Sequence, residues 1–104
     1  MSRYVAQGPL QGENAENFTI GSSDSTLTAG TYDTAKTAVI SVTDANAILI
    51  TVKNDAGTAP SDGSKGIYWE KSYGPFVFHG DLSKILIRRS GSSDCAINVN
   101  YFHS

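Results

Sequence analysis

Apolar and polar residues alternate in short blocks along most of the chain from Ala35 onward. Successive side chains of a β-strand point to opposite faces, so a period of two predicts strands with one buried and one solvated face. Glycine, serine or proline closes nearly every block, and these residues favour turns. The pattern predicts strands at about residues 18–20, 26–28, 37–43, 46–53, 66–71, 75–79, 84–89 and 94–102.

About seven or eight short strands separated by turn signals predict an all-β protein. We expect a single-domain antiparallel β-sandwich with a jelly-roll-like arrangement, and a small β-barrel is the alternative. A chain of 104 residues has the usual size of one domain. The predicted core consists of Phe18, Ile20, Leu27, Ile40, Val42, Ile48, Ile50, Val52, Trp69, Phe76, Phe78, Ile85, Ile87, Ile97 and Val99.

Two short segments carry more specific signals. Asp44 and Ala45 separate two strands so closely that the spacing predicts a tight hairpin. Residues 82–89 also contain apolar residues at helical spacing, so a short helix is the alternative prediction for this segment. Ile85 and Ile87 are β-branched and alternate with their neighbours, so a strand is favoured.

The first fifteen residues have no sustained period. This predicts an extended N-terminal arm over residues 1–15, followed by a β-sandwich domain over residues 16–104. The sizeable apolar side chains of the arm are Tyr4, Val5 and Leu10, and we expect them to dock on a neighbouring subunit. A loose leader or a short edge strand is the alternative, because termini of this composition often fray.

Some strands are apolar on both faces. Leu49, Val77 and Leu86 are out of phase with the core positions, so they are predicted to point away from the core. A second apolar face suggests burial against another subunit, and we expect a homo-oligomer, either a dimer or a trimer. Central strands with a few outward apolar residues are the simpler alternative.

Charge and hydropathy exclude two classes of partner. The net charge of −2 provides no basic excess for binding nucleic acid. No segment approaches the ~18 consecutive apolar residues of a membrane-spanning helix. Residues 2–8 contain no apolar export segment, so we expect the protein to be assembled in the cytoplasm.

The sequence contains no pattern typical of catalysis or of a metal site. His79 and His103 have no further ligand at metal-binding spacing, and the acidic residues occur singly, mostly beside turn-forming residues. Cys95 is in phase with the apolar residues of its strand, so it is predicted to be a core residue. We therefore expect no catalytic residue, no metal, no cofactor and no enzymatic activity.

Tyr68, Trp69 and Tyr73 form the one aromatic cluster of the sequence, close to a Gly-Pro pair. Exposed aromatic rings at the ends of loops can stack on sugar rings, so these residues are a possible ligand platform. The favoured interpretation places Trp69 in the core, with the two tyrosines flanking it and their hydroxyl groups reaching water or a partner.

The last part of the chain joins residues 84–89 to a final strand, residues 94–102, through a Ser-Gly-Ser-Ser turn. Together with the small size, the acidic composition and the irregular N-terminal segment, this pair is similar to the closing hairpins of small all-β virion proteins of tailed bacteriophages. The chain most resembles the capsid decoration (cement) proteins. The resemblance implies a virion location, a dimer or trimer, and binding to the major capsid protein or another virion protein. It transfers no site residue.

The leading hypothesis is a non-enzymatic virion structural protein, either a capsid decoration protein or a head–tail accessory protein that binds between capsid subunits. Apolar area buried across several contacts would provide the free energy, and multivalent attachment would increase it. A carbohydrate-binding or receptor-binding β-sandwich module is the alternative.

Deletion of residues 2–12 tests the predicted arm. The truncated domain should remain folded but attach more weakly to the particle, because the arm would no longer contact a neighbouring subunit. Co-sedimentation with particles measures this attachment. Equal sedimentation of the truncated and complete chains would contradict the prediction.

Overall fold

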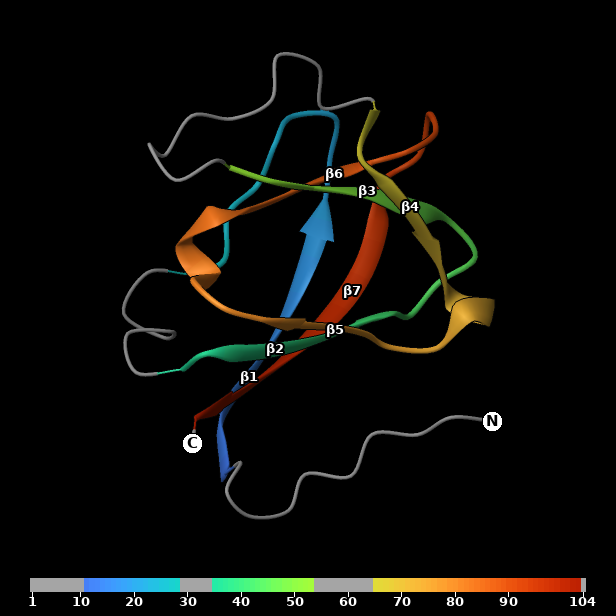
Figure 1. Cartoon of the computed structure of the whole chain (residues 1–104). Coiled ribbons are helices and arrows are strands. Elements are labelled where there is room, and N and C mark those ends of the chain that lie inside the picture. Colours follow the sequence, from blue (N-terminus) through green and yellow to red (C-terminus); the bar gives the residue numbers. More distant parts are fainter. Residues whose placement is uncertain (1–10, 29–34, 54–64, 104) are drawn as a thin grey trace.

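The alternating pattern produces seven strands and two 3₁₀ turns in the computed structural model, which describes residues 11–28, 35–53 and 65–103 (Figure 1). The all-β prediction is therefore confirmed. The strands are β1 (Gln11–Ile20), β2 (Thr37–Val42), β3 (Ala47–Val52), β4 (Ile67–Glu70), β5 (Phe76–His79), β6 (Ile85–Arg89) and β7 (Cys95–His103). The 3₁₀ turns are η2 (Lys71–Tyr73) and η3 (Leu82–Lys84).

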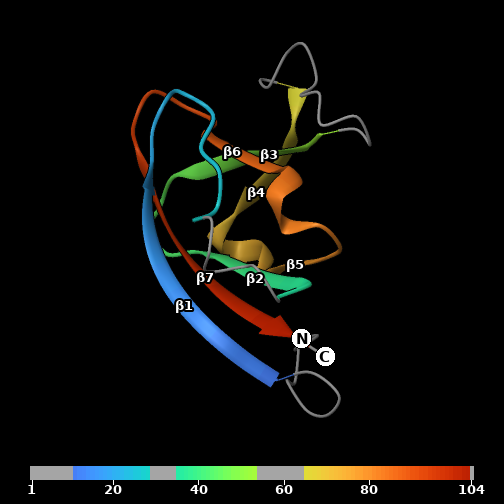
Figure 2. The ribbon, with the colours of Figure 1, turned by 90° about the vertical axis from the view of Figure 1, so that its left-hand side faces the viewer.

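The strands form two antiparallel sheets. The first, which we call sheet A, has the order β1-β7-β2-β5, and the second, sheet B, has the order β4-β3-β6. Figure 2 shows β1 and β7 as a curved wall along one side of the molecule, with β3 and β6 crossing near its upper end. The apolar faces of the two sheets meet in one core, which makes the domain a β-sandwich.

The strand pairs are nested in the sequence. β1 pairs with β7, Ser25 forms a bridge with Ile87, β2 pairs with β5, and β3 pairs with β4. Such nesting is the pattern of one long hairpin. When this long hairpin curls around the core, β2 also pairs with β7 and β3 also pairs with β6. This is the jelly-roll arrangement expected from the sequence.

The hairpin predicted at Asp44 and Ala45 is wrong, because β2 belongs to sheet A and β3 to sheet B. The connection is a corner that is attached to β7. The Asp44 carboxylate accepts hydrogen bonds from the backbone N–H groups of Ala96 and Asn46, each at 2.8 Å. The N–H of Thr43 donates to the carbonyl of Ala96 at 3.0 Å. These bonds turn the chain from one sheet into the other.

The closing hairpin between residues 84–89 and 94–102 is also wrong. β6 lies in sheet B and β7 in sheet A, so the turn between them connects two sheets. The N–H of Arg89 donates to the carbonyl of Gly21, and the N–H of Ser90 donates to the carbonyl of Ala47. The residues that enter this turn thus bond to distant segments. The local likeness to the closing hairpins of decoration proteins does not extend to the pairing of these strands.

The boundary predicted after residue 15 moves to Gln11. Residues 11–15 form the first half of β1, with Gln11 opposite His103 and Ala15 opposite Asn100. β7 is nine residues long and provides backbone partners for this polar segment, so no apolar periodicity is needed. Residues 1–10, including Tyr4, Val5 and Leu10, lie outside the described residues. A deletion that ends at residue 10 therefore leaves β1 complete.

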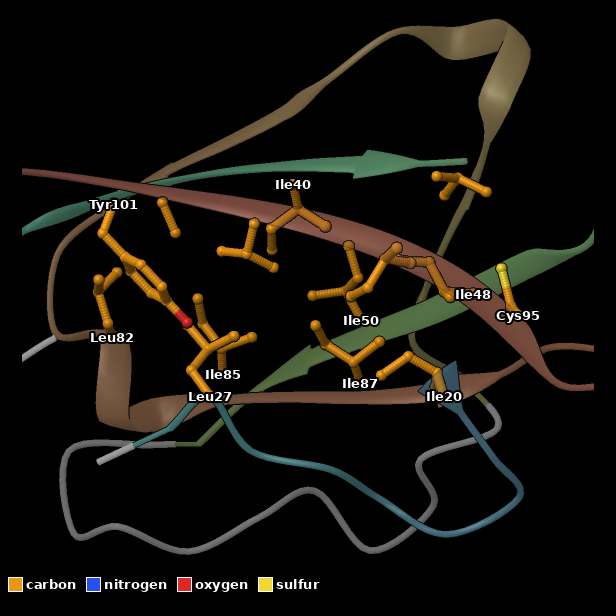
Figure 3. Packing of buried hydrophobic residues seen from close by; sticks show 14 of the residues in the cluster. Ile20, Leu27, Ile40, Ile48, Ile50, Leu82, Ile85, Ile87, Cys95 and Tyr101 are labelled. Atoms are coloured by element: carbon orange, nitrogen blue, oxygen red, sulfur yellow. The ribbon is translucent and has the colours of Figure 1, made fainter. Parts of the chain in front are cut away.

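The core is close to the prediction, with exceptions at its ends. Tyr101 and Leu82 are buried core residues that the pattern did not select, and the Tyr101 ring lies among Leu27, Leu82 and Ile85 (Figure 3). Leu82 belongs to η3, so the segment with mixed signals contains a 3₁₀ turn followed by a strand. Val52 was predicted to be buried, but it is 37% exposed at the end of β3. Four aromatic residues pack against the core while partly buried: Phe18, Trp69, Phe76 and Phe78.

Substitution of Gly66 by alanine should weaken the start of the β3–β4 pair. A Cβ atom at Gly66 would lie 2.8 Å from the carbonyl oxygen of Ile50 and 2.9 Å from Cγ2 of Thr51. Because backbone must move to relieve the first contact, we expect the free energy of unfolding to fall by about 1–3 kcal/mol. Urea denaturation measures this change.

Gly91→Ala is the matched control, because a Cβ atom at Gly91 meets nothing within 4 Å. Its free energy of unfolding should be unchanged or slightly higher. Equal effects of the two substitutions would contradict the close approach of Gly66 to β3.

Candidate functional site

Four large apolar or aromatic side chains are exposed along edge strand β4 and the segments beside it. Val52 is 37% exposed, Ile67 49%, Tyr68 46% and Tyr73 53%. We call these four residues the β4 patch, because they lie on or beside strand β4. Single exposed apolar residues are ordinary, whereas a group of this kind marks an interaction surface.

The position of β4 at the edge of its sheet explains this exposure. Ile67 lies opposite Ile50, which is fully buried, but no described strand lies on the other side of β4. Val52 is two residues beyond Ile50 and therefore shares its face of the sheet. The sequence alternation identifies these apolar positions correctly, but it does not show which strand is at an edge. For that reason Val52 and Ile67 were missed as functional candidates.

Tyr73, in η2, contacts both aromatic rings of β4. Tyr68 and Trp69 are neighbours in a strand, so their side chains point to opposite faces of the sheet. The Tyr73 ring contacts both, with centroids 6.1 Å from Tyr68 and 5.2 Å from Trp69. Tyr73, in the 3₁₀ turn that follows β4, therefore contacts one ring from each face of the strand and joins the two rings into one aromatic surface.

Trp69 anchors this aromatic surface to the core. It is half-buried and packs edge-to-face on Phe76, with ring centroids 5.0 Å apart. Its indole N–H donates to the carbonyl of Gly74 at 2.8 Å, which fixes the turn after η2. Tyr68 and Tyr73 flank it and are exposed, but their rings are inclined by 65°, so they do not form a flat platform.

Glu70 links the aromatic surface to a shallow hollow. The hydroxyl group of Tyr68 donates to its Oε1 at 2.8 Å, and the hydroxyl group of Ser72 donates to its Oε2. The hydrogen bonds from Ser72 and Tyr68 lower the pKa of Glu70. The hydrogen bond between Tyr68 and Glu70 also raises the pKa of Tyr68. The hollow has a volume of about 510 Å³ and is lined by Asp44, Ala45, Glu70, Lys71 and Ser72.

Lysine residues lie close to the β4 patch in the sequence. Lys53 follows Val52 directly, and Lys65 and Lys71 lie on either side of β4 in the sequence. Lys65 and Lys71 are exposed, and Lys53 is half-buried. Three lysines thus adjoin the patch in the sequence, and the carboxylate of Glu70 lies against Tyr68, whereas the whole chain has a net charge of −2.

The three outward apolar residues predicted from the sequence do not form one surface. Leu49 lies opposite Tyr68 on the outer face of sheet B, where it is half-buried. Leu86 shares this face, but it is only 6% exposed, so its predicted exposure is wrong. Val77 lies opposite Val39 on the outer face of sheet A, on the other side of the sandwich. A single interface cannot cover both faces.

Cys95 is buried, as predicted from its phase. Burial and the neighbouring carboxylate of Asp44 raise the pKa of its thiol to about 12, which leaves it protonated and unreactive near neutral pH. His79 Nδ1 lies 2.7 Å from the hydroxyl group of Thr37. In the described part of the chain, no three His, Cys, Asp or Glu side chains are grouped so as to hold a metal ion. The same residues contain no helix with the length and apolarity required to cross a membrane.

Comparison with protein-family models, with curated protein sequences and with solved structures finds no match to the chain. The geometry of the β4 patch and of the two sheet faces therefore carries the functional argument.

Asp44 should make the stability of the corner depend on pH. The N–H groups of Ala96 and Asn46 lower its folded-state pKa below the ordinary value of 3.8. A lowered folded-state pKa contributes stability that is present above the unfolded pKa and is lost as the pH falls through the folded pKa. The urea concentration at the midpoint of unfolding should therefore decrease in the native chain as the pH is lowered below about 4. In Asp44→Asn the same change of pH should decrease this midpoint less.

Glu70→Gln provides the comparison, because Glu70 also has a lowered pKa but its carboxylate accepts hydrogen bonds from the side chains of Tyr68 and Ser72, away from β7. Amide hydrogen exchange at Ala96 should accelerate in Asp44→Asn and remain unchanged in Glu70→Gln. An unchanged pH dependence and unchanged exchange in Asp44→Asn would contradict the role given to the corner.

Proposed function

We propose that the chain is a non-enzymatic virion structural protein that decorates a capsid, and that it binds between capsid subunits through the β4 patch. The observation that carries this proposal is the group of four exposed apolar and aromatic side chains along edge strand β4 and the segments beside it. Tyrosine rings surrounded by polar residues are typical of the centres of protein interfaces.

The two tyrosines of the β4 patch are held in place before any partner binds. Tyr73 is held by its ring contacts with Tyr68 and Trp69, and Tyr68 is held by its hydrogen bond to Glu70. Side chains that are already ordered lose little conformational entropy on binding, so more of the apolar contact contributes to affinity. Lys65 and Lys71, which adjoin the patch in the sequence, favour a partner with acidic residues around an apolar centre.

The fold supports the proposal without deciding it. Jelly rolls occur in viral capsid proteins and also in lectins, and one fold can serve unrelated functions. The resemblance to decoration proteins in size, acidity and N-terminal character favours the virion. The predicted homo-oligomer and the binding of a major capsid protein remain part of this proposal.

A carbohydrate-binding module is the second candidate. Tyr68 and Tyr73 are exposed beside a hollow whose wall includes the carboxylate of Glu70, which can accept hydrogen bonds from sugar hydroxyl groups. The 65° inclination of the two rings disfavours stacking of one sugar ring on both. The chemistry of the hollow supports this candidate, and the geometry of the rings favours the first.

Substitution within the β4 patch tests the two candidates together. Virions from the host that carries the gene would be purified on a density gradient, and copies of the chain per particle would be counted by quantitative mass spectrometry. Ile67→Ser and Tyr73→Ala should each reduce occupancy roughly tenfold, because each removes a central apolar contact. Circular dichroism would show that both variants remain folded.

Lys36→Ala is the control, because Lys36 is exposed and lies outside the patch. Its occupancy should equal that of the native chain. Absence of the native chain from particles would refute the virion proposal. Loss of glycan-array binding in Tyr68→Ala and Tyr73→Ala, with Ile67→Ser unaffected, would establish the carbohydrate candidate in its place.

A further inference from the structure

From Ala15 to Thr19 of β1, and along β2, β5 and β7, the outer face of sheet A carries no Asp, Glu, Lys or Arg. Its register places every second residue of four strands on this face. The face consists of Ala15, Asn17 and Thr19 of β1, Thr37, Val39 and Ser41 of β2, Val77 and His79 of β5, and Ala96, Asn98, Asn100 and Phe102 of β7. The outer face of sheet B, in contrast, includes Glu70 and Arg88.

This neutral face is accessible to a partner. Asn17, Thr19 and His79 are exposed, and Ser41 and Asn98 at its centre are half-buried. Thr37, where β2 begins, is buried, so the accessible part of the face does not include it. Figure 2 shows that β1 and β7 form a smoothly curved surface on this side of the molecule. Depletion of charged residues distinguishes the centre of a protein interface from ordinary surface. The centre of the face therefore shares the charge depletion of an interface centre.

Three asparagine side chains on this face form a hydrogen-bonded ladder. The Nδ2 group of Asn100 donates to Oδ1 of Asn98 at 2.6 Å, and Nδ2 of Asn98 donates to Oδ1 of Asn17 at 3.1 Å. No bond among the described residues uses Nδ2 of Asn17 or Oδ1 of Asn100. The ladder thus presents a donor at one end and an acceptor at the other.

We infer that the outer face of sheet A binds the same face of a second copy of the chain. An uncharged surface is best matched by another uncharged surface, because a charged partner would lose solvation without gaining a counter-charge. In a two-fold arrangement the second ladder runs in the opposite direction, so Asn17 of each copy faces Asn100 of the other. The face is self-complementary, as a two-fold interface requires.

The size of the face sets the strength of this contact. A ten-residue strand such as β1 is ~34 Å long, and the four strands of sheet A lie ~4.8 Å apart, across three gaps. The product of this length and width is on the order of 500 Å² on each copy. A standard stable interface buries about 800 Å² on each partner. The dimer is therefore weak and depends on protein concentration. This inference gives one form to the homo-oligomer of the proposed function, but it is argued from the face of sheet A and stands apart from the capsid contact at the β4 patch.

Sedimentation-velocity ultracentrifugation of the complete chain over a wide range of concentration tests the inference. The native chain should form dimers at high concentration, and the dissociation constant should be unaffected by salt, because no charges meet. Asn17→Asp preserves the acceptor for Asn98 but places like charges in the contact and removes the free donor. It should weaken the dimer roughly tenfold or more.

Ser92→Asp is the matched control, since it adds the same charge in the exposed turn between β6 and β7. It should leave the dissociation constant unchanged, and thermal unfolding would verify that both variants are folded. A native chain that stays monomeric at the highest concentration would overturn the inference. So would native-like association of Asn17→Asp, or loss of association in Tyr73→Ala, which would assign the contact to the β4 patch.

Discussion

The whole structure depends on the pairing of the last strand with the first. β7 lies between β1 and β2 at the centre of sheet A, and its inward side chains Cys95, Ile97, Val99 and Tyr101 are all buried. Its backbone also holds the corner at Asp44, which directs the chain into sheet B. Without this strand, neither the edge of sheet B nor the outer face of sheet A would be positioned.

The positions of the strands could be predicted from the sequence more reliably than the pairs that the strands form. Alternation depends on the side chains of one segment, so the strands that carry Ile40, Ile50 and Ile97 could be located from it. Pairing depends on backbone contacts with distant segments. A carboxylate such as Asp44 therefore suggested a local turn, although its hydrogen bonds run to β7. The polar first half of β1 was missed for the same reason, because its backbone partners lie at the other end of the chain.

The candidate site was only partly visible in the sequence. Tyr68, Trp69 and Tyr73 are close together in the chain, so their clustering could be predicted, but the orientation of their rings could not. Val52 and Ile67 have the phase of core residues. Ile67 is exposed on edge strand β4, which has no described neighbour on its outer side, and Val52 is exposed at the end of β3, beyond the last β3–β4 pair. The edge position of a strand is a property of the sheet, and no local pattern encodes it.

The nested pairing of strands has a consequence for biosynthesis. The ladder between β1 and β7 joins segments separated by most of the chain, so its loop-closure entropy must be overcome before these contacts stabilise anything. A ribosome adds β7 after the other six strands. Until then the apolar faces of the nascent chain lack their central partner, and the chain would depend on slow post-translational folding or on chaperone protection.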